Sequence, residues 1–217
     1  MTAGQSVLQK YMKAKKIALI LIPLNIILAF FVYNSINSEV KFNKIAKIRI
    51  SENVQKLKDL RQVQVKYKQE KGIFADNFET LTNFLNNDSI SIIKAIGETP
   101  DSLTELQALE LGIISRDTTY ALAKETVFDE AYMQSRKVDF PLDINNLTTV
   151  AHSNIVYSID AGQVEKGKVI VQVFEISTNY GSVFNGIDAS NKKYELDALL
   201  KVGSMSEASL NGNWKSE

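Results

Sequence analysis

The sequence predicts an α+β protein: an N-terminal transmembrane helix continues into a long helical stalk, followed by a small α+β head with an antiparallel sheet. Three observations lead to this prediction. Residues 17–33 are uncharged and mostly apolar, residues 35–71 contain neither proline nor glycine, and two late stretches are rich in β-branched residues. The predicted segments are a basic cytoplasmic tail at 1–16, a transmembrane helix at 17–34, a helical stalk at 35–72 and an extracytoplasmic head at 73–217.

The uncharged run IALILIPLNIILAFFVY is just long enough to cross a lipid bilayer. Its 17 residues cover roughly 26 Å as a helix, which approaches the roughly 30 Å of a hydrocarbon core. Pro23 and Asn25 would weaken a soluble helix, but a membrane helix tolerates them when neighbouring groups satisfy the freed backbone. We therefore expect residues 17–34 to lie in the bilayer.

The charges around this run predict its orientation. Four lysines precede it: Lys10, Lys13, Lys15 and Lys16. By the positive-inside rule they place the N-terminus in the cytoplasm and the head in the periplasm or outside, although basic residues at 41, 44, 47 and 49 reduce the contrast. A cleaved signal peptide is the alternative. The residues after the run lack a small-x-small cleavage pattern, which favours a retained anchor in the cytoplasmic (inner) membrane.

Composition excludes several classes of function. Lys plus Arg equals Asp plus Glu at 25 each, whereas a nucleic-acid-binding protein needs a basic face, so we expect no nucleic-acid partner. The chain has no cysteine, which excludes disulfides, thiolate metal sites and cysteine nucleophiles. One local asymmetry stands out, because residues 98–110 contain four acidic residues and no Lys or Arg.

The apolar positions of the stalk shift their face along its length. Ile36, Val40 and Leu57 lie close to a 3.5-residue repeat, but the apolar face then moves to Leu60 and Val63. A sustained coiled coil keeps one face. We interpret the first half of the stalk as solvated and the second half as packed on the head. A weak homo-oligomer through the stalk is the alternative.

The stalk is predicted to end at Gly72, a natural left-handed cap, and Asp76 or Asn77 is suited to cap the next helix. A basic N-terminal region, an apolar helix that continues into a stalk, and the run Tyr67-KQEK-Gly72-Ile-Phe74 together resemble the start of type IV pilin-like proteins and pseudopilins. Lys15-Lys16 stand where that family has its peptidase site, and the glutamate five residues into the apolar run is missing. The resemblance implies a shared body plan and a role in envelope assembly.

The head is predicted to contain a short helix and several extended segments. Thr104 or Ser102 is suited to cap a helix whose apolar face includes Leu103, Leu106, Ala108 and Leu109 and which Gly112 ends. The clearest β pattern is a hairpin with a turn across 161–167, whose second arm is a central strand. The other predicted segments are an extended piece at 113–120, a short strand at 126–128, an extended piece at 138–142, a hairpin of 154–163 with 168–178, a short helix or extended return at 194–202 and a closing strand at 208–214.

No motif of known chemistry is present. His152 has no second His or Cys to complete a transition-metal site, and we expect it to be solvated or hydrogen-bonded. Adjacent Arg116 and Asp117 predict a structural salt bridge, and the acidic pairs 139 with 143 and 188 with 195 match no defined metal or glycosidase spacing. We therefore assign no catalytic, cofactor-binding or metal residue and expect neither a cofactor nor an enzyme.

Two classes of function remain. In the first, the protein is a structural or assembly subunit of the cell envelope that works through protein–protein contacts with membrane or envelope partners. In the second, the head is a membrane-tethered binding module for a peptide, glycan or lipid. The first fits better, because the head has no concentration of Trp, Tyr and Arg of the kind that forms binding pockets.

Overall fold

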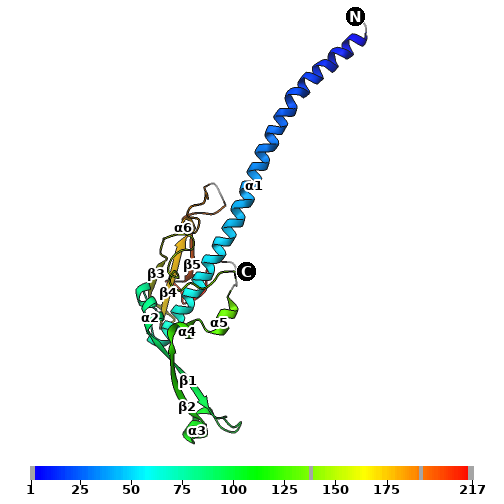
Figure 1. Cartoon of the computed structure of the whole chain (residues 1–217). Helices are drawn as coiled ribbons and strands as arrows, with labels where there is room; N and C mark the ends of the chain where they lie inside the picture. Colours follow the sequence, from blue (N-terminus) through cyan, green and yellow to red (C-terminus); the bar gives the residue numbers. More distant parts are fainter. Residues whose placement is uncertain (1–2, 137–138, 191–192, 215–217) are drawn as a thin grey trace. The chain divides into compact units, whose positions relative to one another are not determined.

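The computed structural model describes residues 3–136, 139–190 and 193–214, and confirms the predicted α+β class with a long N-terminal helix (Figure 1). The chain divides into two compact units, Met1–Ile48 and Arg49–Glu217. One helix, α1 (Ala3–Lys71), forms the first unit and contributes its later turns to the second.

Among the described residues, α1 is the one helix long and apolar enough to cross a membrane. Its apolar side chains from Leu21 to Tyr33 are exposed all round the helix, as a lipid-facing segment requires. Asn25 donates its side-chain amide to the carbonyl oxygen of Leu21 at 2.9 Å, so one of its two amide N–H groups is satisfied within the helix. By length and composition, this helix is a candidate membrane span.

The second unit, which we call the head, contains two antiparallel sheets. A two-stranded sheet pairs β1 (Ser89–Ile96) with β2 (Ser115–Leu122), and a three-stranded sheet has the order β3-β4-β5. The latter confirms the predicted hairpin and its central strand. The remaining elements are α2 (Phe78–Asn87), α3 (Glu105–Glu110), α4 (Ala123–Val127), α5 (Glu130–Ser135), β3 (Ser158–Lys166), β4 (Val169–Asn179), α6 (Tyr180–Val183) and β5 (Leu199–Gly203).

The core of the head is formed by the second half of α1 and one face of the three-stranded sheet. Leu57, Leu60 and Val63 of α1 are almost fully buried, which agrees with the predicted packing of the second half of the stalk. Phe42 and Ala46 are also buried, so the first half is not solvated throughout as predicted. The inward side chains of the sheet are equally buried: Phe174, Ile176, Leu200 and Val202. The opposite face carries the ion pair of Lys201 with Glu175, at 2.7 Å, so this face of the sheet is the more polar one at that point.

Two buried amides of α1 bind the backbone of the head. Gln64 donates to the carbonyl of Ala75 at 2.7 Å and accepts from its N–H at 3.0 Å. Asn53 accepts from the N–H of Ala151 at 2.9 Å and from the Tyr157 hydroxyl at 2.5 Å. Because a buried polar group must be paired, these bonds specify where each segment meets the helix.

The end of α1 follows the sequence prediction. The N–H of Gly72 donates to the carbonyl of Lys68 at 2.8 Å, and Gly72 has φ +81°. Asn77, one of the two predicted caps, accepts from the N–H of Thr80 at the start of α2. The chain thus turns back, and Phe74 packs against Phe174 with ring centroids 4.7 Å apart.

We expect Gly72→Val to destabilise the head by at least about 1 kcal/mol, because a β-branched residue is strained at positive φ. Gly72→Asn should cost less, since asparagine tolerates this region. No atom lies within 4 Å of an added Cβ, so the effect isolates backbone strain. Urea denaturation of the full-length chain in detergent, followed by fluorescence of the sole tryptophan, Trp214, measures it. Equal urea midpoints for the wild type, Gly72→Val and Gly72→Asn would contradict a chain reversal that depends on positive φ at Gly72.

Two predicted segments are wrong in type or length. Residues 126–128 are not a strand, because Ala123 and Val127 lie one helical turn apart and are both buried, which favours α4. The turn predicted across 161–167 is only Gly167-Lys168, whose φ values are +58° and +69°, and residues up to Lys166 remain paired with β4. Two consecutive positive φ values define the type I′ turn that suits a hairpin.

The C-terminal segment also differs from its prediction. Of the two alternatives for 194–202, the extended return is correct for residues 199–202, which belong to β5, whereas residues 194–198 form turns and bends. Residues 208–214 make an isolated bridge, Val202 with Gly212, in place of a full strand. Asn213 ties this segment down, donating to the Leu199 carbonyl at 2.7 Å and accepting from the Lys201 N–H at 2.9 Å. The piece predicted at 138–142 begins at Val138, which lies outside the described residues.

Residues 89–122 form an arm that projects from the end of the head where α1 stops (Figure 1). Lys71 at the end of α1 binds Asp88 at 2.7 Å, and the N–H of Ala123 donates to the Asp88 carbonyl at 2.9 Å, so the root of the arm is fixed on both strands. The strands pair over eight positions, from Ser89 with Leu122 to Ile96 with Ser115, a length of about 25 Å.

Candidate functional site

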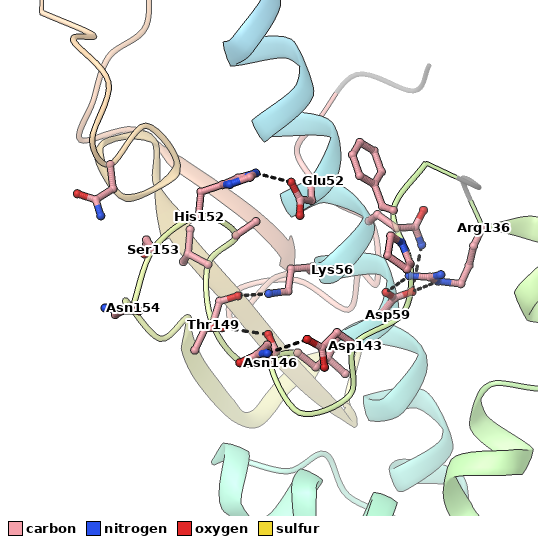
Figure 2. Close-up of a pocket in the computed structure, with 17 residues that line it drawn as sticks. Glu52, Lys56, Asp59, Arg136, Asp143, Asn146, Thr149, His152, Ser153 and Asn154 are labelled. Atoms are coloured by element: carbon pink, nitrogen blue, oxygen red, sulfur yellow. Dashed lines mark hydrogen bonds and ion pairs between the residues drawn. The ribbon is translucent and has the colours of Figure 1, made fainter.

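A polar cavity of about 550 Å³ lies beside α1 in the head. Glu52, Lys56 and Asp59 line it from the helix, and residues 140–154 line the opposite side (Figure 2). The three helical residues are spaced at i, i+4 and i+7, which places them on one face. Its size is in the range of small-molecule sites.

A buried ion pair closes one end of this cavity. Arg136 donates from Nε to Oδ1 of Asp59 at 2.9 Å and from Nη2 to Oδ2 at 2.8 Å, and the side chains are 6% and 1% exposed. The same carboxylate accepts from Gln55 at 3.0 Å and from the Tyr132 hydroxyl at 2.8 Å. Burial and the neighbouring Asp59 charge raise the pKa of Tyr132, so its hydroxyl stays a donor. This cluster joins α5 to α1.

The other end of the cavity is half-exposed. Nε2 of His152 lies 2.8 Å from Oε2 of Glu52, so the histidine is hydrogen-bonded, as predicted. His152 has φ +62°, an uncommon value outside glycine. Lys56 donates to the Thr149 carbonyl at 2.5 Å, and burial lowers its pKa while the nearby carboxylates, Glu52 first, oppose that effect. Each of these contacts links α1 to the loop that carries His152.

The loop that lines this cavity also contains hydrogen bonds of its own. Asp143 accepts from the Asn146 amide at 2.7 Å and from the Asn145 N–H at 3.1 Å, and the Asn146 bond lowers the pKa of the carboxyl. The Ser153 hydroxyl accepts from the N–H of Ile155 at 2.9 Å. Within the described ranges, no group of three or more His, Asp or Glu side chains is arranged to hold a metal ion. The groups around the cavity mainly stabilise the loop against the helix.

The remaining candidate residues lie apart from this cavity. Arg116 does form a structural ion pair, but with Glu105 at 3.0 Å and not with Asp117. Asp139 is exposed, whereas Asp143 lines the cavity. Asp188 accepts from the N–H of Ser190 at 3.1 Å, and Glu195 is exposed.

A second candidate site is the far end of the arm, residues 97–114, which we call the tip. Its small interior consists of Ala108 and Ile114, which are 0% and 2% exposed. Thr104 caps α3 through a capping box with Gln107, and the N–H of Ile113 donates to the Ala108 carbonyl at 2.9 Å. Gly112, at φ +68°, ends the turn as predicted.

At the tip Ala108 is buried, whereas Leu106 and Leu111 are exposed. Leu106, on the predicted apolar face of α3, is 66% exposed, so the fold uses that face only in part. Leu111, which follows the helix and lies outside the predicted face, is 65% exposed. Ile96 and Ile113 beside them are also exposed. Sequence periodicity placed Leu106 on an apolar face but could not indicate its exposure, because it assumes that such a face packs on a core.

Comparisons with protein-family models, with curated proteins and with solved structures find no match to this chain.

Proposed function

We propose that this protein is a single-pass, membrane-anchored subunit of the cell envelope whose head works through contacts with other proteins, in a structural or assembly role. The projecting arm is the observation that carries this proposal. Each of its two strands has one unpaired edge in the described structure, and its faces expose Ile93 and Tyr120. Open edges and exposed apolar side chains are features that partner proteins cover.

The anchor and its orientation belong to the same proposal. An apolar helix near the N-terminus, preceded by four lysines, supports insertion with the N-terminus in the cytoplasm and the head in the periplasm or outside. The pilin-like body plan fits this arrangement. A tethered binding module is the second candidate, and the cavity beside α1 is the observation that favours it.

We expect a reporter that is active only outside the cytoplasm to be active when fused after Glu217. We also expect the full-length chain, extracted with mild detergent, to purify with a fixed ratio of other membrane proteins. A reporter active only inside would contradict the orientation. A lone monomer that retains a small molecule would favour the binding module.

A further inference from the structure

Asn25 lies at the centre of the apolar run that the proposed function places in the bilayer. The run covers residues 17–33, so eight residues separate Asn25 from each end, which corresponds to about 12 Å of helix. A side chain as short as that of asparagine cannot reach lipid headgroups or water across this distance. Its hydrogen bonds must therefore come from its own helix or from another protein group inside the hydrocarbon core.

The helix satisfies only part of the Asn25 amide. Nδ2 donates to the Leu21 carbonyl oxygen at 2.9 Å. An amide side chain has a second N–H donor and a carbonyl oxygen that accepts. Within the described part of the chain, no residue donates to Oδ1 of Asn25 or accepts from its second N–H. Because lipid tails can complete neither bond, a polar group of a neighbouring membrane helix is needed at this depth.

The side chains around Asn25 have the spacing of a seam between two helices. Leu21, Leu28 and Val32 lie at −4, +3 and +7 from it, and each falls within about 60° of Asn25 round the helix. In the single chain they are 47%, 53% and 58% exposed. In a heptad, Asn25 and Val32 take a positions and the two leucines take d positions. This combination favours parallel dimers, in which an a-position asparagine sets the register, and membrane helices pack with similar geometry.

The seam is confined to the membrane segment. The next two positions of the pattern are Ser35 and Glu39, which are both polar. Glu39 accepts a hydrogen bond from the Asn43 side chain of its own helix at 3.1 Å. An association through this seam is therefore distinct from a homo-oligomer through the stalk.

We propose that two copies of this chain associate through their membrane helices, with the two Asn25 amides hydrogen-bonded to each other at the centre of the bilayer. This inference rests on the proposed function, because it requires the anchor to lie in the bilayer. All copies insert with the same orientation, so the two helices are parallel, and a twofold axis along the bilayer normal brings both Asn25 side chains to the same depth. The N–H of one amide then donates to Oδ1 of the other.

Two other ways of covering this amide fit less well. The anchor helix of a different protein would need a polar group at the same depth, whereas a second copy supplies one by symmetry. Lipid acyl chains contain neither donors nor acceptors, so they leave the amide unpaired. An amide is both donor and acceptor, and this self-complementarity favours a second copy over both alternatives.

Cysteine crosslinking in membranes tests this proposal, because the chain contains no cysteine of its own. Leu28→Cys places a thiol on the proposed seam, and Ile27→Cys is the matched control. The two side chains are 53% and 52% exposed at neighbouring depths, but Ile27 lies about 160° from Asn25 round the helix. Each full-length variant is oxidised with copper phenanthroline in isolated membranes. We expect a disulfide-linked dimer of the chain from position 28 and little or none from position 27.

The amide is tested in the same membranes. Adding Asn25→Leu to Leu28→Cys should lower the yield of the dimer about tenfold, the factor that corresponds to about 1.4 kcal/mol. Asn25→Gln should keep most of the yield, because glutamine retains an amide. Leucine makes the run more apolar, so a lower yield would not result from failed insertion. The amount of chain in the membrane fraction checks this for each variant.

The outcomes separate this inference from the proposed function. Equal dimer yields from positions 27 and 28, or a yield that Asn25→Leu leaves unchanged, overturns the contact between Asn25 amides. A product of position 28 that contains a different protein in place of a second copy also overturns it. A chain that stays in the membrane fraction as a monomer overturns only this inference and leaves an assembly role of the head intact. A chain recovered in the soluble fraction overturns the membrane anchor, and with it both proposals.

Discussion

Replacing Asp59 by asparagine should destabilise the head by about 3–5 kcal/mol, the usual cost of breaking a buried ion pair. The substitution conserves shape but leaves the Arg136 guanidinium, 6% exposed, with a neutral amide in place of a carboxylate. Three other donors meet the same carboxylate, from Gln55, Tyr132 and the Arg136 Nε, and an amide can satisfy fewer of them. The loss therefore exceeds that of one hydrogen bond.

Urea denaturation of the full-length chain in detergent, with Trp214 fluorescence as the probe, measures this change. Asp160→Asn is the matched control, because that carboxylate is exposed on β3 and its removal should change the free energy of unfolding little. The double variant Asp59→Leu with Arg136→Met should lose much less free energy of unfolding than the two single variants lose together. Each single variant leaves one buried charge without its partner, whereas the double variant leaves none. Additive single effects would show that the two side chains act independently.

The features of this protein that the sequence predicts correctly are local ones: helix ends, a hairpin and an apolar helix. Gly72 ends α1 and Thr104 caps α3 because caps depend on residues within one turn. The hairpin of β3 and β4 follows from two adjacent runs of β-branched residues, although its short turn was not foreseen because Gly162 lies within a paired strand. The apolar run at 17–33 is likewise a local property of composition.

Contacts between segments far apart in the chain leave no local pattern in the sequence. Asp59 and Arg136 are 77 positions apart, and Asn53 and Tyr157 are 104 apart, so nothing in either neighbourhood indicates its partner. The exposure of Leu106 at the tip was missed for a related reason, because exposure depends on which elements meet and not on periodicity.

Replacing Gly203 by alanine should be at least about 2–3 kcal/mol more destabilising than the same change at Gly72. Both glycines have positive φ, +78° and +81°, so both substitutions carry the same backbone strain of about 1 kcal/mol. They differ in space, because a Cβ at Gly203 would lie 2.2 Å from the carbonyl oxygen of Phe174 whereas none of the atoms near Gly72 lies within 4 Å.

This close approach at Gly203 cannot relax cheaply. Phe174 is fully buried and packs on Phe74, and the N–H of Gly203 donates to the Asn211 carbonyl at 3.0 Å, so backbone is held on both sides of the glycine. Gly203→Ala should therefore separate the end of β5 from β4 and expose Leu200 and Val202, which form the core. Urea midpoints of the two alanine variants in the full-length chain compare these effects directly. Equal losses of stability at Gly72 and Gly203 would mean that the β4–β5 edge adjusts to a methyl group, and the tight closure of the sheet described here would be wrong.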